Sequence, residues 1–279
     1  MFTGLALLSS LMWGGADFLG GKLAKRFPSL AVTGVSQSIG LLTGITMLTA
    51  SSGWLHPDFT MHGYLFNGVL AGIAGFVGLV SYYAGLSTGK MGVIAPITSL
   101  SAVIPLIYGL LQGERPSQFQ IAGMVVALLG CFFASGPELK SGVSAKPIAL
   151  GLLTSVMFGV ALIFMARGSQ VSALMTMTSM RFLTVGICIL IALFSRSIGG
   201  FTLSTIPVLI AIGVADFLAN FTLGVATTKG LVSVAMVLGS LFPVVTMLLA
   251  YKFLHERLQR IQYLGVFFAA VGVALISAG

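Results

Sequence analysis

The sequence carries very little charge. Of its 279 residues, 7% are Asp, Glu, Lys or Arg, and 57% are hydrophobic. A soluble domain typically has about 25% charged residues, whereas the mean hydropathy of this chain is +1.07. Too few polar side chains are present to cover a globule of this length in water. The composition therefore excludes a soluble protein and predicts a chain that lies in a lipid bilayer.

Acidic residues, cysteines and histidines are also scarce. The chain has 6 Asp and Glu against 14 Lys and Arg, for a net charge of +8, but no basic run is long enough for a nucleic-acid surface. Cys131 and Cys188 lie inside apolar runs and lack the spacing of a zinc site. The 3 histidines form no HExxH pattern, and there is no GxxxxGK[ST] loop. These absences argue against nucleic-acid binding, a metal site and ATP-driven pumping.

Ten apolar runs are long enough to cross a membrane. A bilayer core requires about 20 apolar residues in helical form. No Lys or Arg precedes the first run, so it lacks the basic segment of a signal peptide, and we expect it to be a retained span. The predicted spans lie at residues 3–21, 29–51, 62–88, 90–112, 118–135, 146–167, 170–195, 203–228, 229–253 and 259–278.

The chain contains an internal repeat. One set of residues recurs at an offset of 142 (256 − 114 and 272 − 130): Glu114, Arg115, Gln120, Gly123 and Gly130 match Glu256, Arg257, Gln262, Gly265 and Gly272. A second set recurs at an offset of 145 (155 − 10): Ser10, Met12, Trp13, Gly14 and Ala16 match Ser155, Met157, Phe158, Gly159 and Ala161. Small residues that pack helix against helix could produce the glycine matches alone, but the Glu-Arg motif lies in a loop.

The repeat predicts the architecture. It divides the chain into residues 1–137 and 145–279, with five spans in each half. Because five is odd, the second half enters the membrane from the opposite side. The predicted fold is therefore an all-α membrane protein with ten transmembrane helices, arranged as two five-helix inverted-topology repeats. Such repeats are typical of secondary transporters that work by alternating access.

The chain resembles a known family. The five-plus-five spans, Trp13-Gly14 in the first span and the stretch Gly-Glu-Arg-Pro at 113–116 are similar to the ten-helix EamA-type members of the drug/metabolite transporter superfamily. The resemblance covers essentially the whole chain. It implies a carrier in the plasma (inner) membrane without a bound cofactor, often an exporter of amino acids, related metabolites or toxic compounds. It also implies a central cavity lined by the first, third and fourth helices of each half, but it does not define the substrate.

Three ionisable residues lie at membrane depth, where charge is costly and commonly functional. Asp17 shares a helix face with Trp13 and is expected at a substrate or proton site; the alternative is an interfacial carboxylate that pairs with Lys22. Arg181 and Asp216 lie in consecutive spans, which usually touch. They are expected either to form a buried structural ion pair or to handle substrate and protons directly, with Arg181 able to bind a carboxylate.

Further candidates are polar, aromatic or helix-bending residues. Thr98 and Ser240 are repeat counterparts (240 − 98 is 142) beside prolines, which kink helices and leave carbonyl groups unpaired. In a membrane such carbonyls require protein or cavity water, so these hydroxyls are expected to line the cavity. The remaining pathway candidates are Phe158, Tyr82 and Asn220, and the gating candidates are Pro96, Pro105 and Pro243.

The sequence favours a secondary active exporter of amino acids, other small metabolites or drugs, and not an enzyme. One alternative is a proton antiporter of organic cations, because Asp17 and Lys25 resemble the pattern of small multidrug members of the superfamily. An intramembrane enzyme or a channel is the alternative from another class, but no nucleophile–base pair or ion filter is recognisable. The expected partners are a small-molecule substrate and the lipid bilayer, and a monomer is compatible with the sequence.

The loop charges and the family resemblance disagree on orientation. The family places both termini in the cytoplasm, which leaves three basic residues on that side: Arg115, Arg167 and Lys229. Ten then lie on the other side: Lys22, Lys25, Arg26, Lys90, Lys140, Lys146, Arg196, Lys252, Arg257 and Arg260. Cytoplasmic loops usually hold the excess of Lys and Arg. We follow the family orientation as the expectation to be tested.

Overall fold

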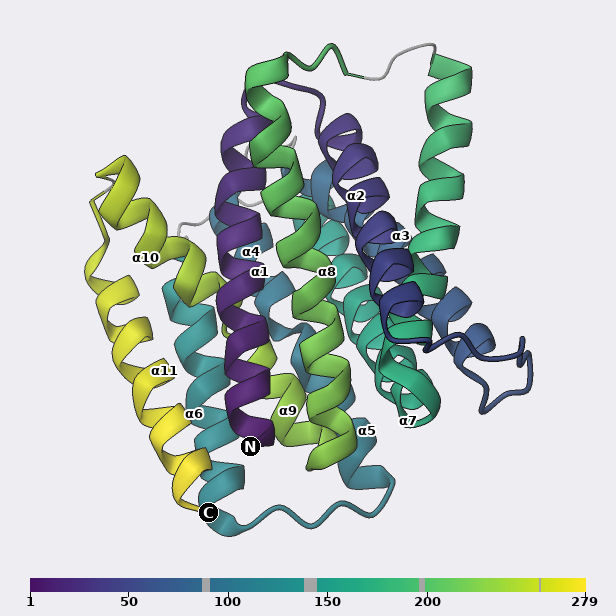
Figure 1. Cartoon of the computed structure of the whole chain (residues 1–279). Helices are drawn as coiled ribbons and strands as arrows, with labels where there is room; N and C mark the ends of the chain where they lie inside the picture. Colours follow the sequence, from purple (N-terminus) through teal and green to yellow (C-terminus); the bar gives the residue numbers. More distant parts are fainter. Residues whose placement is uncertain (87–90, 138–144, 196–198, 256) are drawn as a thin grey trace.

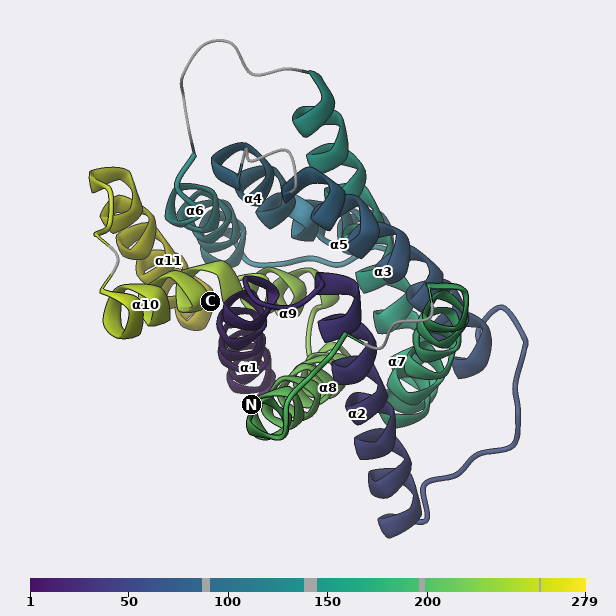
Figure 2. The same ribbon diagram turned by 90° about the horizontal axis from the view of Figure 1, so that it is seen from above.

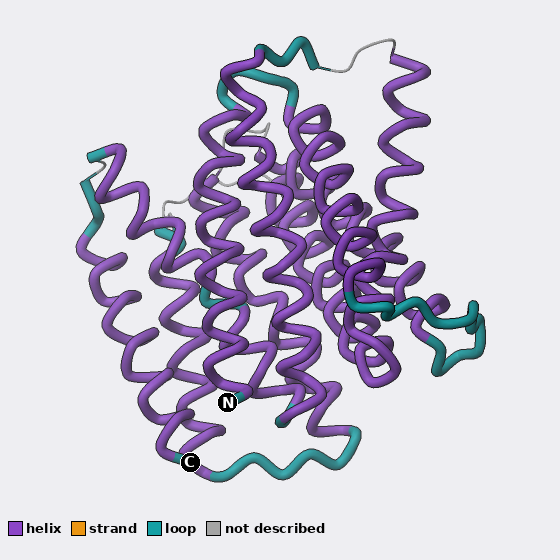
Figure 3. Tube along the Cα trace, in the orientation of Figure 1, coloured by secondary structure: helices purple, strands orange, loops and turns teal. Residues whose placement is uncertain are grey.

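A computed structural model describes residues 1–86, 91–137, 145–195, 199–255 and 257–279. Throughout these residues the regular structure is helical, and no strand is found in them (Figure 3). The helices are α1 (Phe2–Ala24), α2 (Ser29–Ala50), α3 (Tyr64–Leu86), α4 (Met91–Ser99), η1 (Leu100–Ala102), α5 (Val103–Leu111), α6 (Gln118–Ala134), α7 (Ala145–Ser195), η2 (Leu203–Thr205), α8 (Ile206–Lys229), α9 (Val232–Gly239), α10 (Phe242–Leu254) and α11 (Arg260–Ala278).

These helices supply the ten predicted spans. The fourth span is α4, η1 and α5 in succession, and the ninth is α9 followed by α10. Helix α7 is 51 residues long and contains two spans, because Ser172 has extended backbone (φ −161°, ψ 112°) inside it. The chain reverses there: a methyl group on Gly168 would come within 2.6 Å of the Thr176 side chain. The prediction of an all-α, multi-pass membrane fold is confirmed.

Both termini lie at the same end of the molecule, which we call the termini end (Figure 1). Helix α1 runs away from this end, whereas the first half of α7 runs toward it (Figures 1 and 2). The two halves of the chain therefore begin at opposite ends, as five spans per half require. The chain directions agree with the expected inverted topology.

The distribution of side chains is the reverse of that in a soluble protein. Large apolar side chains face outward along the helices, among them Leu11, Leu42, Ile73, Leu111, Phe119, Val125 and Phe194. Polar side chains are buried between the helices, among them Ser9, Ser10, Asn67, Arg181, Asn220 and Ser233. A surface of this kind is stable against lipid tails. Among the buried polar groups, Arg181 pairs with a residue of the neighbouring helix α8, whereas the hydroxyls of Ser9 and Ser233 have no partner among the described residues.

Helices α6 and α11 pack closely against each other across the two halves. A methyl group on Gly123 would lie 2.8 Å from the Gly272 carbonyl oxygen, and one on Gly130 would lie 2.9 Å from that of Gly265. Gly265 is the repeat counterpart of Gly123, and Gly272 is that of Gly130. Each contact is thus the image of the other under exchange of the halves, which is what a two-fold axis between them produces.

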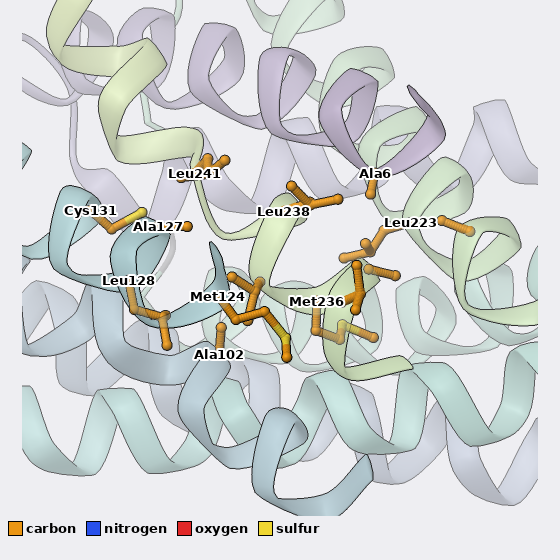
Figure 4. Packing of buried hydrophobic residues seen from close by; sticks show 14 of the residues in the cluster. Ala6, Ala102, Met124, Ala127, Leu128, Cys131, Leu223, Met236, Leu238 and Leu241 are labelled. Carbon is orange, nitrogen blue, oxygen red and sulfur yellow. The ribbon is translucent and has the colours of Figure 1, made fainter. Parts of the chain in front are cut away.

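Helix α9 lies in the centre of the core. Met236 and Leu238 of α9 pack among residues of α1, α6, α8 and η1, which are Ala6, Met124, Leu223 and Ala102 (Figure 4). The five residues 234–238 are all 0% exposed. The ninth span breaks directly after α9, at Ser240 and Leu241, and the fourth span breaks at the corresponding place, η1. Both breaks therefore lie inside the protein, where unpaired backbone groups can find partners.

Candidate functional site

An ion pair between α7 and α8 is the centre of the candidate site. Nη2 of Arg181 lies 2.6 Å from Oδ2 of Asp216. The side chain of Arg181 is 3% exposed and that of Asp216 is 24% exposed. The antiparallel arrangement of the second half of α7 and α8 brings these residues together across a short connection. The pair expected from the sequence is therefore present, and it consists of a buried cation and a partly accessible anion.

Three more side chains bind the Asp216 carboxylate. The indole Nε1 of Trp13 donates to Oδ1 at 3.2 Å, and the amide of Gln37 donates to Oδ2 at 3.1 Å. Asn220, one turn further along α8, donates to the Asp216 carbonyl oxygen at 2.7 Å and lies 3.4 Å from Oδ1. The carboxylate is thus held from α1, α2, α7 and α8 together. Such a network fixes the orientation of Asp216 and couples the four helices.

Gln37 is the member of this network that the sequence analysis missed. Besides donating to Asp216, its side-chain oxygen accepts from the hydroxyl of Thr184 at 3.3 Å. It therefore links the ion pair to a second point on α7. One feature of the sequence could have indicated Gln37 as a site residue. It is the one amide side chain in α2, whose other polar residues are all Ser or Thr.

Asp17 lies one helical turn beyond Trp13 on α1. Its side chain is exposed, and it lies within electrostatic range of the Asp216 carboxylate. Among the described residues no cation lies within ion-pairing distance of it, so the alternative of a pair with Lys22 is not found. The structure therefore brings two carboxylates, Asp17 and Asp216, into one region, and Trp13 of α1 donates a hydrogen bond to Asp216 there.

The guanidinium of Arg181 is almost entirely enclosed. Its Nε has no hydrogen-bond partner in the described part of the chain and lies 3.4 Å from the position that a methyl group on Gly40 would take. The absence of a side chain at Gly40 thus gives the guanidinium its space. Because Arg181 is enclosed while Asp17 and part of Asp216 are accessible, the charge that a ligand could reach in this conformation is negative.

The two broken spans contain the remaining polar candidates. Thr98 is buried at the end of α4, and its hydroxyl has no partner among the described residues. The hydroxyl of Ser240 donates to the Val237 carbonyl oxygen at 2.7 Å, while the Ser240 carbonyl oxygen accepts from the thiol of Cys131 at 3.2 Å. An orphan carbonyl at the break is thus satisfied by α6, the helix that packs on the break from the first half.

The prolines occupy two different positions. Pro96 lies inside α4, as expected for a kink. Pro105 and Pro243 instead lie in the first turns of α5 and α10, where a missing N–H costs nothing because it would have no partner within the helix. These two prolines begin a new helix after a break rather than bend a continuous one.

Tyr82 and Phe158 form a separate contact. Their ring centroids lie 6.5 Å apart, and Phe158 packs against α3 at Gly78, where a methyl group would come within 2.5 Å of its ring. The counterpart of Trp13 in the second half therefore contacts α3, whereas Trp13 itself donates to a carboxylate. The two positions match in sequence but differ in chemistry.

The fold defines a multi-pass α-helical membrane protein built from two repeats. A family model described as the EamA-like transporter family matches the chain twice, at residues 3–136 and 145–278. The chain belongs to this family of membrane transporters, which is part of the drug/metabolite transporter superfamily.

Comparison with solved structures supports the same fold. A crystal structure described only as that of a protein superposes with a TM-score of 0.82 and 17% sequence identity, covering 99% of this chain and 96% of the other. At this identity the likeness concerns the fold alone. A search of curated protein sequences found no match.

Proposed function

We propose that this chain is a secondary active transporter that exports a small metabolite, such as an amino acid, or a drug, in exchange for protons. Its proposed place is the plasma (inner) membrane, with both termini in the cytoplasm as in the family. The observation that carries the proposal is the pair of accessible carboxylates, Asp17 and Asp216, beside the Trp13 indole. A carrier needs a group for which substrate and proton compete, and an exposed carboxylate at membrane depth is such a group.

The two carboxylates have different proposed roles. Asp216 is held by Arg181, Trp13 and Gln37, so its charge is already compensated and its position is fixed. Asp17 has no ion-pair partner among the described residues, so a proton or a substrate group can neutralise it. We assign coupling to Asp17 and the support of the site to Asp216.

A second candidate function is proton-coupled export of organic cations. The difference in exposure between the charged groups of the site favours this function. The guanidinium of Arg181 is enclosed, whereas the carboxylates of Asp17 and Asp216 are accessible to a ligand. An aromatic ring beside a carboxylate is also suited to a cation. A substrate with only a carboxylate would instead have to displace Asp216 from Arg181, which would leave a buried charge pair incomplete.

Flux in proteoliposomes with an imposed pH gradient tests the coupling role. A growth screen against toxic amino-acid analogues and cationic dyes first supplies the transported probe. We expect Asp17→Asn to abolish uphill accumulation of this probe while downhill exchange continues, because the titrating group is removed at constant volume. Asp58→Asn, a carboxylate in the loop between α2 and α3, is the matched control and should behave as wild type.

Two outcomes of this assay would count against the proposal. An Asp17→Asn protein that accumulates the probe at the wild-type rate excludes Asp17 as the coupling group. Flux that does not saturate with probe concentration indicates a channel instead of a carrier.

The proposed orientation has its own test. Seven basic residues of the described chain are exposed at the end opposite the termini: Lys22, Lys25, Arg26, Lys146, Lys252, Arg257 and Arg260. The positive-inside rule would place this end in the cytoplasm, against the family orientation. Labelling of Lys146→Cys in intact cells by a membrane-impermeant maleimide, with unmodified protein as control, distinguishes the two. If the cysteine at position 146 is labelled in intact cells, the termini are cytoplasmic. If it is protected from labelling, the family orientation is wrong for this chain.

A further inference from the structure

Glu114 makes a contact that the proposed transport site does not use. It follows α5 at the termini end, outside the spans, and its carboxylate accepts two backbone N–H groups from the second half of the chain. Oε1 lies 2.6 Å from the nitrogen of Val232, and Oε2 lies 3.0 Å from that of Ser233. These are the first two residues of α9, whose N-terminal N–H groups have no partners within the helix. Glu114 therefore caps α9 from the other repeat.

The local geometry of α5 directs Glu114 to this place. Helix α5 ends at Leu111 and is followed by Gly113 in the left-handed region (φ +92°). Two hydrogen bonds close this end: the Gly113 N–H donates to the Leu110 carbonyl at 3.1 Å, and the Glu114 N–H donates to the Gly109 carbonyl at 3.0 Å. This arrangement favours glycine at position 113. Gly109 matters for a second reason, since a methyl group there would lie 2.5 Å from Oε2 of Glu114. The side chain crosses over Gly109 to reach α9.

The helix that Glu114 caps is central to the ninth span. Residues 234–238 of α9 are fully buried, and the span breaks at Ser240 immediately beyond them. A carboxylate at a helix N-terminus is stabilised by two charge-assisted hydrogen bonds and by the helix dipole. At the termini end, the Glu114 carboxylate therefore ties α9, and with it the break, to the first repeat, in addition to the packing of the buried α9 side chains.

We propose that Glu114 is a positioning residue that keeps the termini end of the pathway closed in this conformation, by tying the α5–α6 connection to α9. Alternating access requires the two repeats to move against each other, so a contact that joins them at one end must break when that end opens. The proposal rests only on the assignment of the chain as a transporter. It is independent of the substrate and of Asp17.

A pocket beside this contact provides a place to detect opening. It has a volume of about 220 Å³ and is lined by Tyr108, Gly109, Gln112, Glu114, Ala166, Arg167, Gln170 and Val232. Ala166 is 2% exposed in the closed arrangement. Release of α9 from Glu114 would widen this pocket and expose position 166.

The experiment measures cysteine labelling at both ends of the molecule. Ala166→Cys reports on the termini end, and Leu23→Cys, 7% exposed in α1, reports on the opposite end. Both are placed in a Cys131→Ser, Cys188→Ser background, reconstituted in nanodiscs so that a polar maleimide reaches both faces. Glu114→Gln removes the charge and is compared with Glu114→Asp and with Arg115→Gln, a change of the neighbouring exposed charge.

We expect Glu114→Gln to raise the labelling rate at position 166 about tenfold while the rate at position 23 stays constant or falls, since two charge-assisted bonds are lost at one end only. Glu114→Asp should give a smaller increase and Arg115→Gln none. Gly109→Ala should act like Glu114→Gln, because its methyl group displaces the carboxylate. An unchanged rate at position 166 overturns the proposal. Equal increases at both positions also overturn it, because they indicate a helix cap that merely stabilises the fold.

Discussion

The two halves of the chain contribute equivalent residues to the α6·α11 contact but different residues to the polar network around Asp216. At the α6·α11 contact the two halves contribute equivalent residues, and Gly123 faces Gly272 as Gly265 faces Gly130. The network is one-sided. Trp13 corresponds to Phe158 and Asp17 to Leu162, and the stretch of α3 at residues 71–75, which corresponds to the region of Asp216, contains only Ala, Gly and Ile.

The symmetric contact is a packing contact, whereas the ionisable side chains lie in the one-sided network. Backbone-to-backbone packing depends on small residues at fixed spacing, so both copies can retain it and the contact becomes symmetric. A buried charge is costly unless it is paired, so doubling the network would double that cost. A single asymmetric site at the interface of two similar halves is what a carrier with one substrate site requires.

The largest effect is expected from breaking the network. Asp216→Asn leaves the Arg181 guanidinium enclosed without a counter-charge, and we expect a loss of about 3–5 kcal/mol in unfolding free energy. The measurement is the thermal unfolding midpoint in detergent, together with the yield of folded protein. The double variant Arg181→Met, Asp216→Leu should recover most of the loss. Wild-type stability of Asp216→Asn would show that the pair does not support the fold.

A smaller effect is expected at the α6·α11 contact. Gly265→Ala places a methyl group against the Ala134 backbone, and Gly123→Ala, at the repeat counterpart, places one against that of Ile276. Because backbone cannot move aside as a side chain can, we expect each to cost about 1–3 kcal/mol. Gly15→Ala, where nothing lies within 4 Å, is the control. Unequal losses at the repeat counterparts 123 and 265 would contradict the symmetry of the contact.

The caps of α6 and α11 allow a finer comparison. The side chain of Gln120 accepts the Ser117 N–H at 3.0 Å, and that of its counterpart Gln262 accepts the Gln259 N–H at 2.9 Å. Gln262 also donates to the Ala134 carbonyl oxygen at 3.1 Å. We expect Gln120→Leu to cost about 1 kcal/mol and Gln262→Leu more, because Gln262 serves two helix ends. Thermal midpoints of the two variants check this order.

The smallest effect on stability is expected at the prolines. Pro243 lies in the first turn of α10, and Pro96 lies inside α4, where alanine would restore an N–H group. We expect Pro243→Ala and Pro96→Ala each to change the free energy of unfolding by less than about 1 kcal/mol. Transport should respond more to Pro96→Ala, by about twofold or more, because this change straightens a helix at the pathway. Flux of the screened probe measures it. Unchanged flux in both variants would remove these residues from the mechanism.

The sequence determined the spans, the repeat and the identity of the ionisable residues inside the membrane. Hydropathy over about 20 residues and the position of prolines are local properties, so ten spans could be recognised without contacts. A connection between the sixth and seventh spans was predicted at residues 168–169, but the extended residue is Ser172, which lies inside the predicted seventh span. The glycine matches at an offset of 142 indicated close packing, but not which helix each glycine would meet.

Only the tertiary structure decided which side chains share a site. Gln37 reaches Asp216 across 179 residues, and Glu114 reaches Val232 across 118, and no local pattern contains such distances. Exposure was likewise decided by packing: Arg181 became enclosed, while Asp17 stayed accessible. The physical reason is that a helix face is fixed by its own sequence, whereas the partner of that face depends on how all ten spans fill the same volume.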